Sequence, residues 1–528
     1  MKSEYWNKRS PEGPWDTIVV GSGMGGMTTA ALLGKLGHRV LVLEQHYVPG
    51  GFTHVFKRKG WTWDVGVHAV GEVTEHSVTG RLLSSLTDGR LKWAPLGQRY
   101  DEFFYPEGRR IDFPSTPREF RDNLVEAFPG QEAAIDAYLA KVRETAAAMK
   151  GYYLARAAPR WAAPLLNRTV ARKAQRAFEE RTGDVVAALT DDEQLRSVFA
   201  AQWGYYGSVP SRSSFAIQAL VVKHFMYGGY YPVGGSESIA RELLRTVAES
   251  GGWTRIQADV GEILVEGGRA TGVRLSNGEE LRAKRVVSAA GIPSTVRRLL
   301  PKEHQQAEWA RSILALKPSS AHVCLYIGFE GDITQAGCGP ANKWFYSTYD
   351  NEQDAWQVDA QGELQDAPIL YTSFPSLKDP NHDPGPKLRH TGEVVTFVPW
   401  KTFEPWLDTK WKRRGADYEG FKKKMEETLL EQLLTRLPEL RPMVKYVELS
   451  TPLSTDHFCR PIAGSIYGLE PTPERFGNPY LRPVSPIKGL YFSGSDVATV
   501  GVIGAMMGGA LAAMAIEPRK ALGYIRKV

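Results

Sequence analysis

One glycine-rich segment, GSGMGG at residues 21–26, constrains the fold of this chain more than any other feature. It matches the pattern G-x-G-x-x-G and directly follows DTIVV at 16–20, an apolar run typical of a buried strand. A helix-compatible stretch from Met24 to Leu36 comes next, and HRVLVL at 38–43 predicts a second strand. This order of strand, tight turn, helix and strand predicts a βαβ unit of the Rossmann type.

The glycine spacing indicates a dinucleotide site. We expect Gly21 to permit the tight turn, Gly23 to let the backbone approach a pyrophosphate, and Gly26 to let the helix pack closely on the strand. The helix N-terminus then offers N–H groups and a partial positive charge to the phosphates. Glu44, at the end of the second strand, is placed to accept hydrogen bonds from ribose hydroxyls. A glycine-rich turn without a ligand is the alternative, and it leaves this acid unexplained.

Two further segments favour FAD over NAD. Pro49-Gly50-Gly51 follows the acid and offers a second place where backbone can approach a dinucleotide. Far downstream, Gly494-Ser495-Asp496 lies between a predicted strand at 489–493 and an apolar helix. A carboxylate at Asp496 could hold ribityl hydroxyls, and the helix N-terminus could face the electron-rich edge of a flavin. A second dinucleotide motif is missing from the sequence, which leaves the redox partner unknown.

The segment 497–516 carries no charged residue and could span a bilayer by its length alone. It is rich in Gly and Ala and poor in Leu and Ile, so its hydrophobic driving force is weak. A helix that is apolar on all sides can also be buried in a large domain, and small residues allow close packing on a cofactor and a sheet. We therefore predict a buried helix here.

The remaining patterns predict a mixed chain. Residues 80–230 show helix-like stretches, at 117–128 and 131–149. Strand signals return over 253–291, with hairpin turns at Glu266-Gly267-Gly268 and Asn277-Gly278. Further elements are expected as strands at 322–329 and 394–398, and as a helix at 417–436.

We predict an α/β fold in which an FAD-binding Rossmann-type domain, similar to glutathione reductase, carries an inserted α+β substrate domain. The FAD-binding domain is expected to be discontinuous, over residues 14–75, 232–300 and 484–520. The substrate domain is expected over residues 76–231 and 301–483, and to be largely helical in its first part.

Composition narrows the class of protein. The three cysteines, Cys324, Cys338 and Cys459, fit neither a disulfide framework nor a zinc site, so we expect no metal and a reducing compartment. The net charge of +6 is mild for 528 residues, and no nucleic-acid signature is present, so we expect no nucleic-acid partner. The first ten residues are polar, so we expect no secretory signal and a cytoplasmic protein.

Several segments resemble one family. PGGFTHVFKRKGWTWDVGVHAVG at 49–71 and GLYFSGSDVATVGVIGAMMGGA at 489–510 resemble the carotenoid and retinoid FAD oxidoreductases, which include phytoene desaturases, carotenoid isomerases and retinol saturases. WGYYGSVPSRSSF at 203–215, YYPVGGSESIARELL at 230–244 and the stretch 450–476 are most similar to the retinol saturase and carotenoid isomerase branch. The resemblance runs over most of the chain.

The resemblance implies a set of FAD-binding residues: Gly21, Gly23, Gly26, Glu44, Gly50, Gly51, Val260, Gly494, Asp496, Val502 and Ile503. It also implies a long apolar tunnel for the substrate, and association with a membrane surface. Residues 151–181 fit such an association, because Arg156, Arg160 and Arg168 alternate with Trp161 and Leu165. Pro159 and Pro164 interrupt a single helix there, and a solvated basic face is the alternative.

The expected activity is oxidation, reduction or isomerisation of carbon–carbon bonds in a long apolar polyene or related lipid, by hydride transfer at flavin N5. The candidate catalytic residues are His68, Tyr206 and Tyr231, and each could instead be structural. A flavin amine oxidase and a non-catalytic prenyl-binding escort protein share the expected fold and are the alternatives.

Overall fold

Strand β2, Trp15–Val20, lies inside an eight-stranded sheet that carries the glycine-rich turn. The structure is a computed structural model and describes residues 4–158, 162–358 and 364–528. β2 pairs in parallel with β3, Val40–Leu43, and with β13, Glu280–Ser288. The other strands extend the sheet: β10 (Trp253–Arg255) and β1 (Trp6–Asn7) beyond β3, and β12 (Arg269–Leu275), β11 (Val260–Glu266) and β19 (Leu490–Phe492) beyond β13.

The strands predicted at 16–20, 38–43 and 489–493 are confirmed as β2, β3 and β19. β3 begins only at Val40, because the amide of His38 closes the last turn of the preceding helix on the carbonyl of Leu33. The hairpin turns are confirmed as well. Gly267 and Gly268 have φ of 56° and 74°, and Gly278 has φ of 91°, a region that favours glycine.

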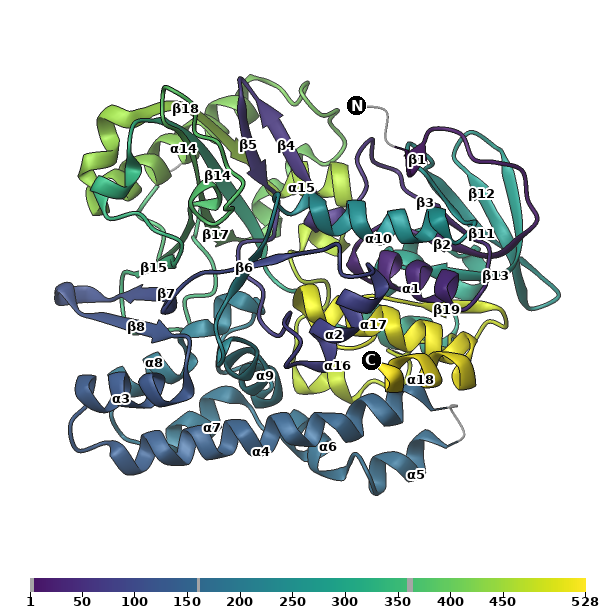
Figure 1. Cartoon of the computed structure of the whole chain (residues 1–528), viewed down its shortest axis with the longest axis horizontal. Coiled ribbons are helices and arrows are strands. Elements are labelled where there is room, and N and C mark those ends of the chain that lie inside the picture. The colour runs from purple at the N-terminus through teal and green to yellow at the C-terminus, as the bar shows by residue number, and fades with distance from the viewer. Residues whose placement is uncertain (1–3, 159–161, 359–363) are drawn as a thin grey trace.

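Helix α17, Gly501–Ile516, is buried against helix α1, Met24–Lys35, at the centre of the molecule (Figure 1). The two backbones approach closely, because a Cβ on Gly509 would lie 2.4 Å from the carbonyl oxygen of Gly25. The uncharged segment 497–516 therefore forms a core helix, as its small residues predicted. Among the described residues, none of the helices combines the length and the apolar character that a bilayer crossing requires.

A second, seven-stranded sheet is built from two distant stretches of the chain. Its order is β18 (Val444–Ser450), β14 (Ala321–Glu330), β17 (Arg389–Val398), β16 (Ile369–Ser373), β15 (Asn342–Tyr346), β7 (Arg99–Phe104) and β8 (Arg110–Pro114). β14 and β17 confirm the strands predicted at 322–329 and 394–398. The parallel pairing of β15 with β7 joins the predicted ranges 301–483 and 76–231 in one sheet. The domain boundaries themselves stay a prediction.

Helices cover the second sheet and form a layer at the bottom of Figure 1. Helix α14, Ala416–Arg436, confirms the helix predicted at 417–436 and buries Phe421, Met425 and Leu429. The lower layer contains α3 (Pro117–Ala127), α4 (Glu132–Ala157) and α9 (Phe215–Phe225), which confirm the helical character of this stretch. α4 continues beyond Met149 because Tyr152 and Ala155 are also buried on its packed face.

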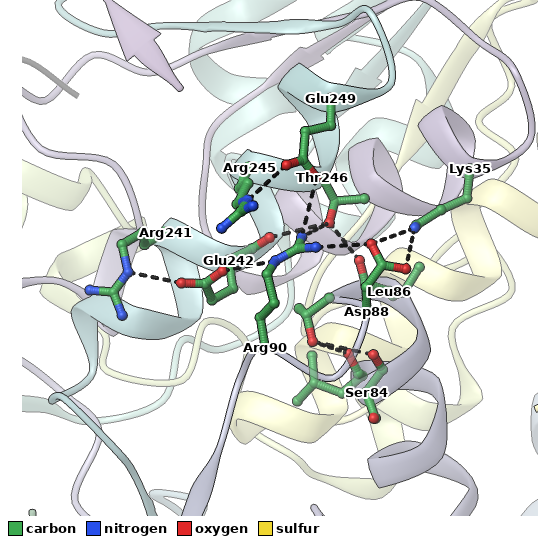
Figure 2. A network of polar contacts seen from close by, with 12 residues as sticks. Lys35, Ser84, Leu86, Asp88, Arg90, Arg241, Glu242, Arg245, Thr246 and Glu249 are labelled. Carbon is green, nitrogen blue, oxygen red and sulfur yellow. Dashed lines mark hydrogen bonds and ion pairs between the residues drawn. The ribbon is translucent and has the colours of Figure 1, made fainter. Parts of the chain in front are cut away.

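A polar network centred on Arg90 ties together three helices beside the first sheet (Figure 2). Arg90, which follows α2 (Val78–Leu86), donates hydrogen bonds to Asp88, at 3.0 Å, and to Glu242 and Thr246 of α10 (Glu237–Glu249), at 3.1 and 2.9 Å. Lys35 of α1 donates to the same Asp88, at 2.6 and 2.8 Å. The network therefore fixes α1, α2 and α10 relative to one another.

Candidate active site

The turn after β2 has the geometry of a dinucleotide site. Gly21 has φ of 96°, and its amide donates to the carbonyl of Leu43 at 2.8 Å. A Cβ on Gly26 would lie 2.1 Å from the carbonyl oxygen of Gly21, so glycine is required where α1 packs on the turn. A Cβ on Gly23 would have no described atom within 4 Å, because this position faces a cavity. The free amides at the start of α1 therefore face open space.

Glu44 is buried at the end of β3 and anchors the turn. Its Oε2 accepts hydrogen bonds from the amide of Ser22, at 2.9 Å, and from the Ser22 hydroxyl, at 2.5 Å. Its Oε1 accepts from the amide of His46 at 2.8 Å. The Ser22 hydroxyl in turn accepts from the amide of Gly50 at 3.0 Å. The carboxylate lines the cavity and keeps acceptor capacity for a ligand hydroxyl.

The second glycine loop touches the first. Gly50 and Gly51 have φ of 123° and 56°, and a Cβ on Gly51 would lie 3.0 Å from the Cα of Gly23. Gly51 lines the cavity, whereas Gly50 shapes the loop behind it.

The C-terminal segment meets the same cavity. Gly494, Asp496 and Val502 line it, as does Val260 at the start of β11. Asp496 is buried, and its two carboxylate oxygens accept hydrogen bonds from the amides of Ile292, at 2.9 Å, and Leu469, at 3.2 Å. Ile503, one residue along α17, packs in the hydrophobic cluster of α1 and does not line the cavity.

The cavity has a volume of about 340 Å³ and connects the two sheets. Its far wall comes from the second sheet and the adjoining loops, and it is mainly aromatic: Tyr205, Trp344, Ile369, Tyr371, Phe397 and Tyr467. Such a wall suits an apolar ligand, while the glycine turns at the opposite end suit an anionic one.

The structure separates the three catalytic candidates. His68 lines the cavity. Tyr206 is fully buried behind the wall and donates to Gln218 at 2.9 Å, whereas its neighbour Tyr205 faces the cavity. Tyr231 is also buried and donates to Asp64. As placed, the hydroxyls of Tyr206 and Tyr231 cannot contact a molecule in the cavity.

Behind His68 lies a cluster of buried ionisable groups that the sequence analysis missed. Glu393, on β17, has its Oε2 atom 2.8 Å from Nδ1 of His68, and its Oε1 accepts from the amide of Asp64 at 2.9 Å. Lys378 donates to the His68 carbonyl at 2.7 Å and to the side chain of Asn342. In the sequence, only Glu393, a charged residue inside the apolar run of β17, could have indicated this cluster.

The burial of these groups shifts their pKa values. Desolvation raises the pKa of Asp64 to about 6. Desolvation lowers the pKa of Lys378 to about 7, although the nearby carboxyls oppose this shift. The pKa of Glu393 is raised well above its ordinary value by burial, and the pKa of His68 is lowered to about 3, mainly by burial. The imidazole of His68 is therefore neutral at pH 7.

Comparisons with known proteins agree with this geometry. The family described as flavin containing amine oxidoreductase matches residues 24–517. The chain is 33% identical to all-trans-retinol 13,14-reductase of Danio rerio, over 96% of this chain and 86% of that protein. It is 27% identical to the chloroplastic prolycopene isomerase 2 of an Oncidium hybrid cultivar, over 93% of this chain and 83% of that protein.

A solved structure of putrescine oxidase supports the fold, with a TM-score of 0.61 and 16% identity, and covers 95% of this chain and 99% of that one. The predicted Rossmann-type fold and the resemblance to the retinol saturase and carotenoid isomerase branch are confirmed. The open face at Gly23 and the buried carboxylates at both ends of the cavity fit the predicted FAD. The chain thus belongs to the flavin-containing amine oxidoreductase family and is an FAD-dependent oxidoreductase.

Proposed function

We propose that this enzyme reduces a carbon–carbon double bond of a long apolar polyene. The observation that carries the proposal is a single cavity that joins the dinucleotide turn to an aromatic wall and to His68. The Danio rerio relative is named for the reduction of all-trans-retinol, and a polyene suits this wall by its shape and apolar surface.

In this proposal the residues around the two glycine turns bind the cofactor. Gly21, Gly23 and Glu44 hold the ADP half, with Val260 beside the adenine. The flavin half of FAD is surrounded by Gly51, Gly494, Asp496 and Val502. Three further residues act indirectly, by shaping the turn, the loop and α17: Gly26, Gly50 and Ile503. When bound, FAD supplies the two-electron redox chemistry.

The chain's own residues orient the substrate, exclude water and supply a proton. The aromatic wall holds the polyene chain and keeps the cavity dry. Saturation of a double bond also requires a proton at the second carbon. His68 is one of several imidazoles that line the cavity, and a carboxyl lies directly behind it. We assign the proton donation to His68 rather than to Tyr206 or Tyr231.

The test is anaerobic incubation of the chemically reduced enzyme with all-trans-retinol and with longer polyenes, followed by product mass. A product heavier by two hydrogens supports the proposal. An unchanged mass with a shifted retention time identifies an isomerase, the activity for which the Oncidium relative is named. Hydrogen peroxide released from amines would instead identify an amine oxidase, and protein that stays colourless after FAD is added would favour an escort protein.

We also propose that the enzyme docks on an anionic membrane surface through residues 154–158 and 162–173. The structure leaves Leu154, Leu165 and Val170 exposed there, and Leu165 is 67% exposed. Arg168, Arg172 and Lys173 are exposed close by in the sequence, and their charge suits anionic lipid. Not all of the basic segment contributes, because Arg156 donates to the backbone carbonyls of Leu481 and Phe476. Pro159, Arg160 and Trp161 lie outside the described residues.

A further inference from the structure

The carboxyl cluster behind His68 carries too much negative charge to be fully ionised. Asp64, Asp101 and Glu393 are buried, and the Lys378 ammonium is the cation that interacts with all three. Three carboxylates against one ammonium would leave a net charge of −2 among side chains that are all buried. Buried like charges of this kind are relieved by binding a proton. At least one carboxyl of the cluster therefore holds a proton at neutral pH.

The hydrogen bonds to the three carboxyls indicate which of them holds this proton. Asp64 accepts from the amide of Ser236, at 3.0 Å, and from the hydroxyl of Tyr231. Oδ1 of Asp101 accepts from the hydroxyl of Tyr205, at 2.7 Å, and from the side chain of Asn342, at 2.9 Å, while its Oδ2 has no hydrogen-bond partner among the described residues. These bonds stabilise the ionised form of each aspartate.

Fewer hydrogen bonds stabilise the ionised form of Glu393 than that of either aspartate. Its Oε1 accepts one hydrogen bond, from the amide of Asp64, at 2.9 Å. Its Oε2 and the Nδ1 atom of His68 lie 2.8 Å apart, and neither atom has a hydrogen-bond partner among the described residues. Two unprotonated acceptors at this distance would repel each other, so one of the two atoms must carry a proton.

We propose that Glu393 stores the proton that the reaction uses, and that His68 delivers it from Oε2 of Glu393 to the substrate. This inference rests on the proposed function. Nδ1 of His68 faces Glu393, which leaves Nε2 as the ring nitrogen that can serve the cavity. As the Nε2–H bond breaks and a C–H bond forms on the substrate, the Oε2–H bond of Glu393 breaks and an Nδ1–H bond forms. The imidazole stays neutral, and the Glu393 carboxylate that results faces Lys378.

This arrangement explains why a buried glutamate lies in a hydrophobic strand. Glu393 has no exposed surface and does not line the cavity, whereas His68, whose Nδ1 lies 2.8 Å from Oε2 of Glu393, does line it. The titratable groups that face it come from several elements: Asp64 and His68 near β5 (Trp61–Asp64), Tyr231 of β9 (Tyr230–Pro232), Cys324 and Tyr326 of β14, Tyr371 of β16, and Lys378. The phenols and the thiol among them have raised pKa values, mainly because of burial, and stay neutral.

The test compares Glu393→Gln with Glu330→Gln, a partly exposed control at the end of β14 that pairs with Arg389. Infrared spectroscopy of the FAD-loaded enzyme should show a protonated carboxyl band that Glu393→Gln removes and Glu330→Gln keeps. In Glu393→Gln the rate of polyene reduction should fall by about 10²-fold or more. Wild-type activity should fall at alkaline pH as Glu393 ionises, and this fall should be absent in Glu393→Gln, while FAD content stays unchanged.

A band that persists in Glu393→Gln, or an unchanged rate and pH profile in that variant, would overturn the inference. If Glu393→Gln does not fold, labelling the wild type with ¹³C-glutamate or ¹³C-aspartate assigns the band. An aspartate assignment overturns the inference as well. The band is measured without turnover, so a polyene that returns unchanged from the wild-type enzyme counts against the proposed function and not against the stored proton.

Discussion

Gly25 in α1 touches Gly494 near the other end of the chain: a Cβ on Gly25 would lie 2.5 Å from the Cα of Gly494. This contact brings the first βα turn and the C-terminal segment into one wall of the cavity. Helix α17 continues the contact, because a Cβ on Gly508 would lie 2.0 Å from the carbonyl oxygen of Gly494. The cavity therefore depends on backbone packing between segments that are distant in the sequence.

Substitution of Gly25 should destabilise the fold and the site together. In Gly25→Ala the new methyl group would overlap backbone that cannot rotate away, at a cost of roughly 1–3 kcal/mol in the free energy of unfolding. Gly420→Ala is the matched control, since a Cβ there meets no described atom within 4 Å and alanine is the better helix former. Thermal unfolding checks both variants, and equal stability of the two would contradict this packing argument.

Two glycines of the same turn should have opposite phenotypes. Gly23→Ala keeps its backbone conformation, with φ of −65°, and places a methyl group in the cavity, so the apoprotein should keep its stability and lose FAD affinity. Gly26→Ala would place a Cβ 2.1 Å from the Gly21 carbonyl and should destabilise the apoprotein by roughly 3 kcal/mol. Fluorescence titration with FAD and urea unfolding of the apoproteins measure the two effects. Loss of stability in Gly23→Ala would show that this position is packed rather than open.

The raised pKa of Asp64 should make stability depend on pH. Burial raises this pKa from 3.8 to about 6, so the folded protein binds the proton more tightly than the unfolded chain. The stability from this proton is present below about pH 4 and is lost as the pH rises through about 6, by at most roughly 3 kcal/mol. Asp64→Asn should remove that part of the pH dependence, and the exposed Asp191→Asn should keep it. Urea unfolding between pH 4 and 7 measures this pH dependence. If the free energy of unfolding varies with pH in the same way in Asp64→Asn and in the wild type, Asp64 is not its source.

The network in Figure 2 predicts unequal roles for two arginines. Arg90→Met removes hydrogen bonds to Asp88, Glu242 and Thr246 and should cost about 2–3 kcal/mol, because Glu242 is mostly buried and loses a charged partner. Arg245→Met removes an exposed pair with Glu249 and should cost less than about 0.5 kcal/mol. Urea unfolding of both variants measures the two losses in the free energy of unfolding. Equal losses would disprove the ranking.

Exposed leucine should matter for membrane binding and not for catalysis. Leu165→Glu places a negative charge where an apolar side chain would enter anionic lipid, so binding to phosphatidylserine vesicles should fall several-fold. Activity on a detergent-solubilised polyene should stay unchanged. Leu407→Glu, also an exposed leucine, is the control. Vesicle sedimentation measures both variants, and an equal loss in the two would show that this surface is not the docking site.

Local sequence was sufficient for the first βαβ unit. The glycine spacing, the apolar runs on either side and Glu44 all act over about 30 residues, and hydrogen bonds such as those from Ser22 to Glu44 follow from that unit. The buried character of α17 was also predictable, because glycine and alanine at its contact positions suit close packing better than a lipid environment. Gly494 and Asp496 were also expected at the cofactor, from their place between a strand and an apolar helix, and the structure brings both to the same cavity.

The orientation of individual side chains could not be predicted in the same way. Tyr205 and Tyr206 are neighbours in the sequence, yet only Tyr205 lines the cavity, because the short 3-10 turn at Ala201–Tyr205 directs the two side chains apart. Tyr231 was a candidate proton donor to the substrate, but its hydroxyl is buried and donates a hydrogen bond to Asp64 instead.

The sequence alone determined the Rossmann unit, the cofactor class and the general character of the substrate, because these depend on short-range patterns and on segments that keep their form across a family. Only the tertiary structure decided which groups meet at the reacting end of the cavity. His68, Lys378 and Glu393 come from separate parts of the chain, and their burial, distances and pKa values exist only once two sheets have packed together. A charge acquires an unusual pKa from its surroundings, and those surroundings are a property of the folded molecule.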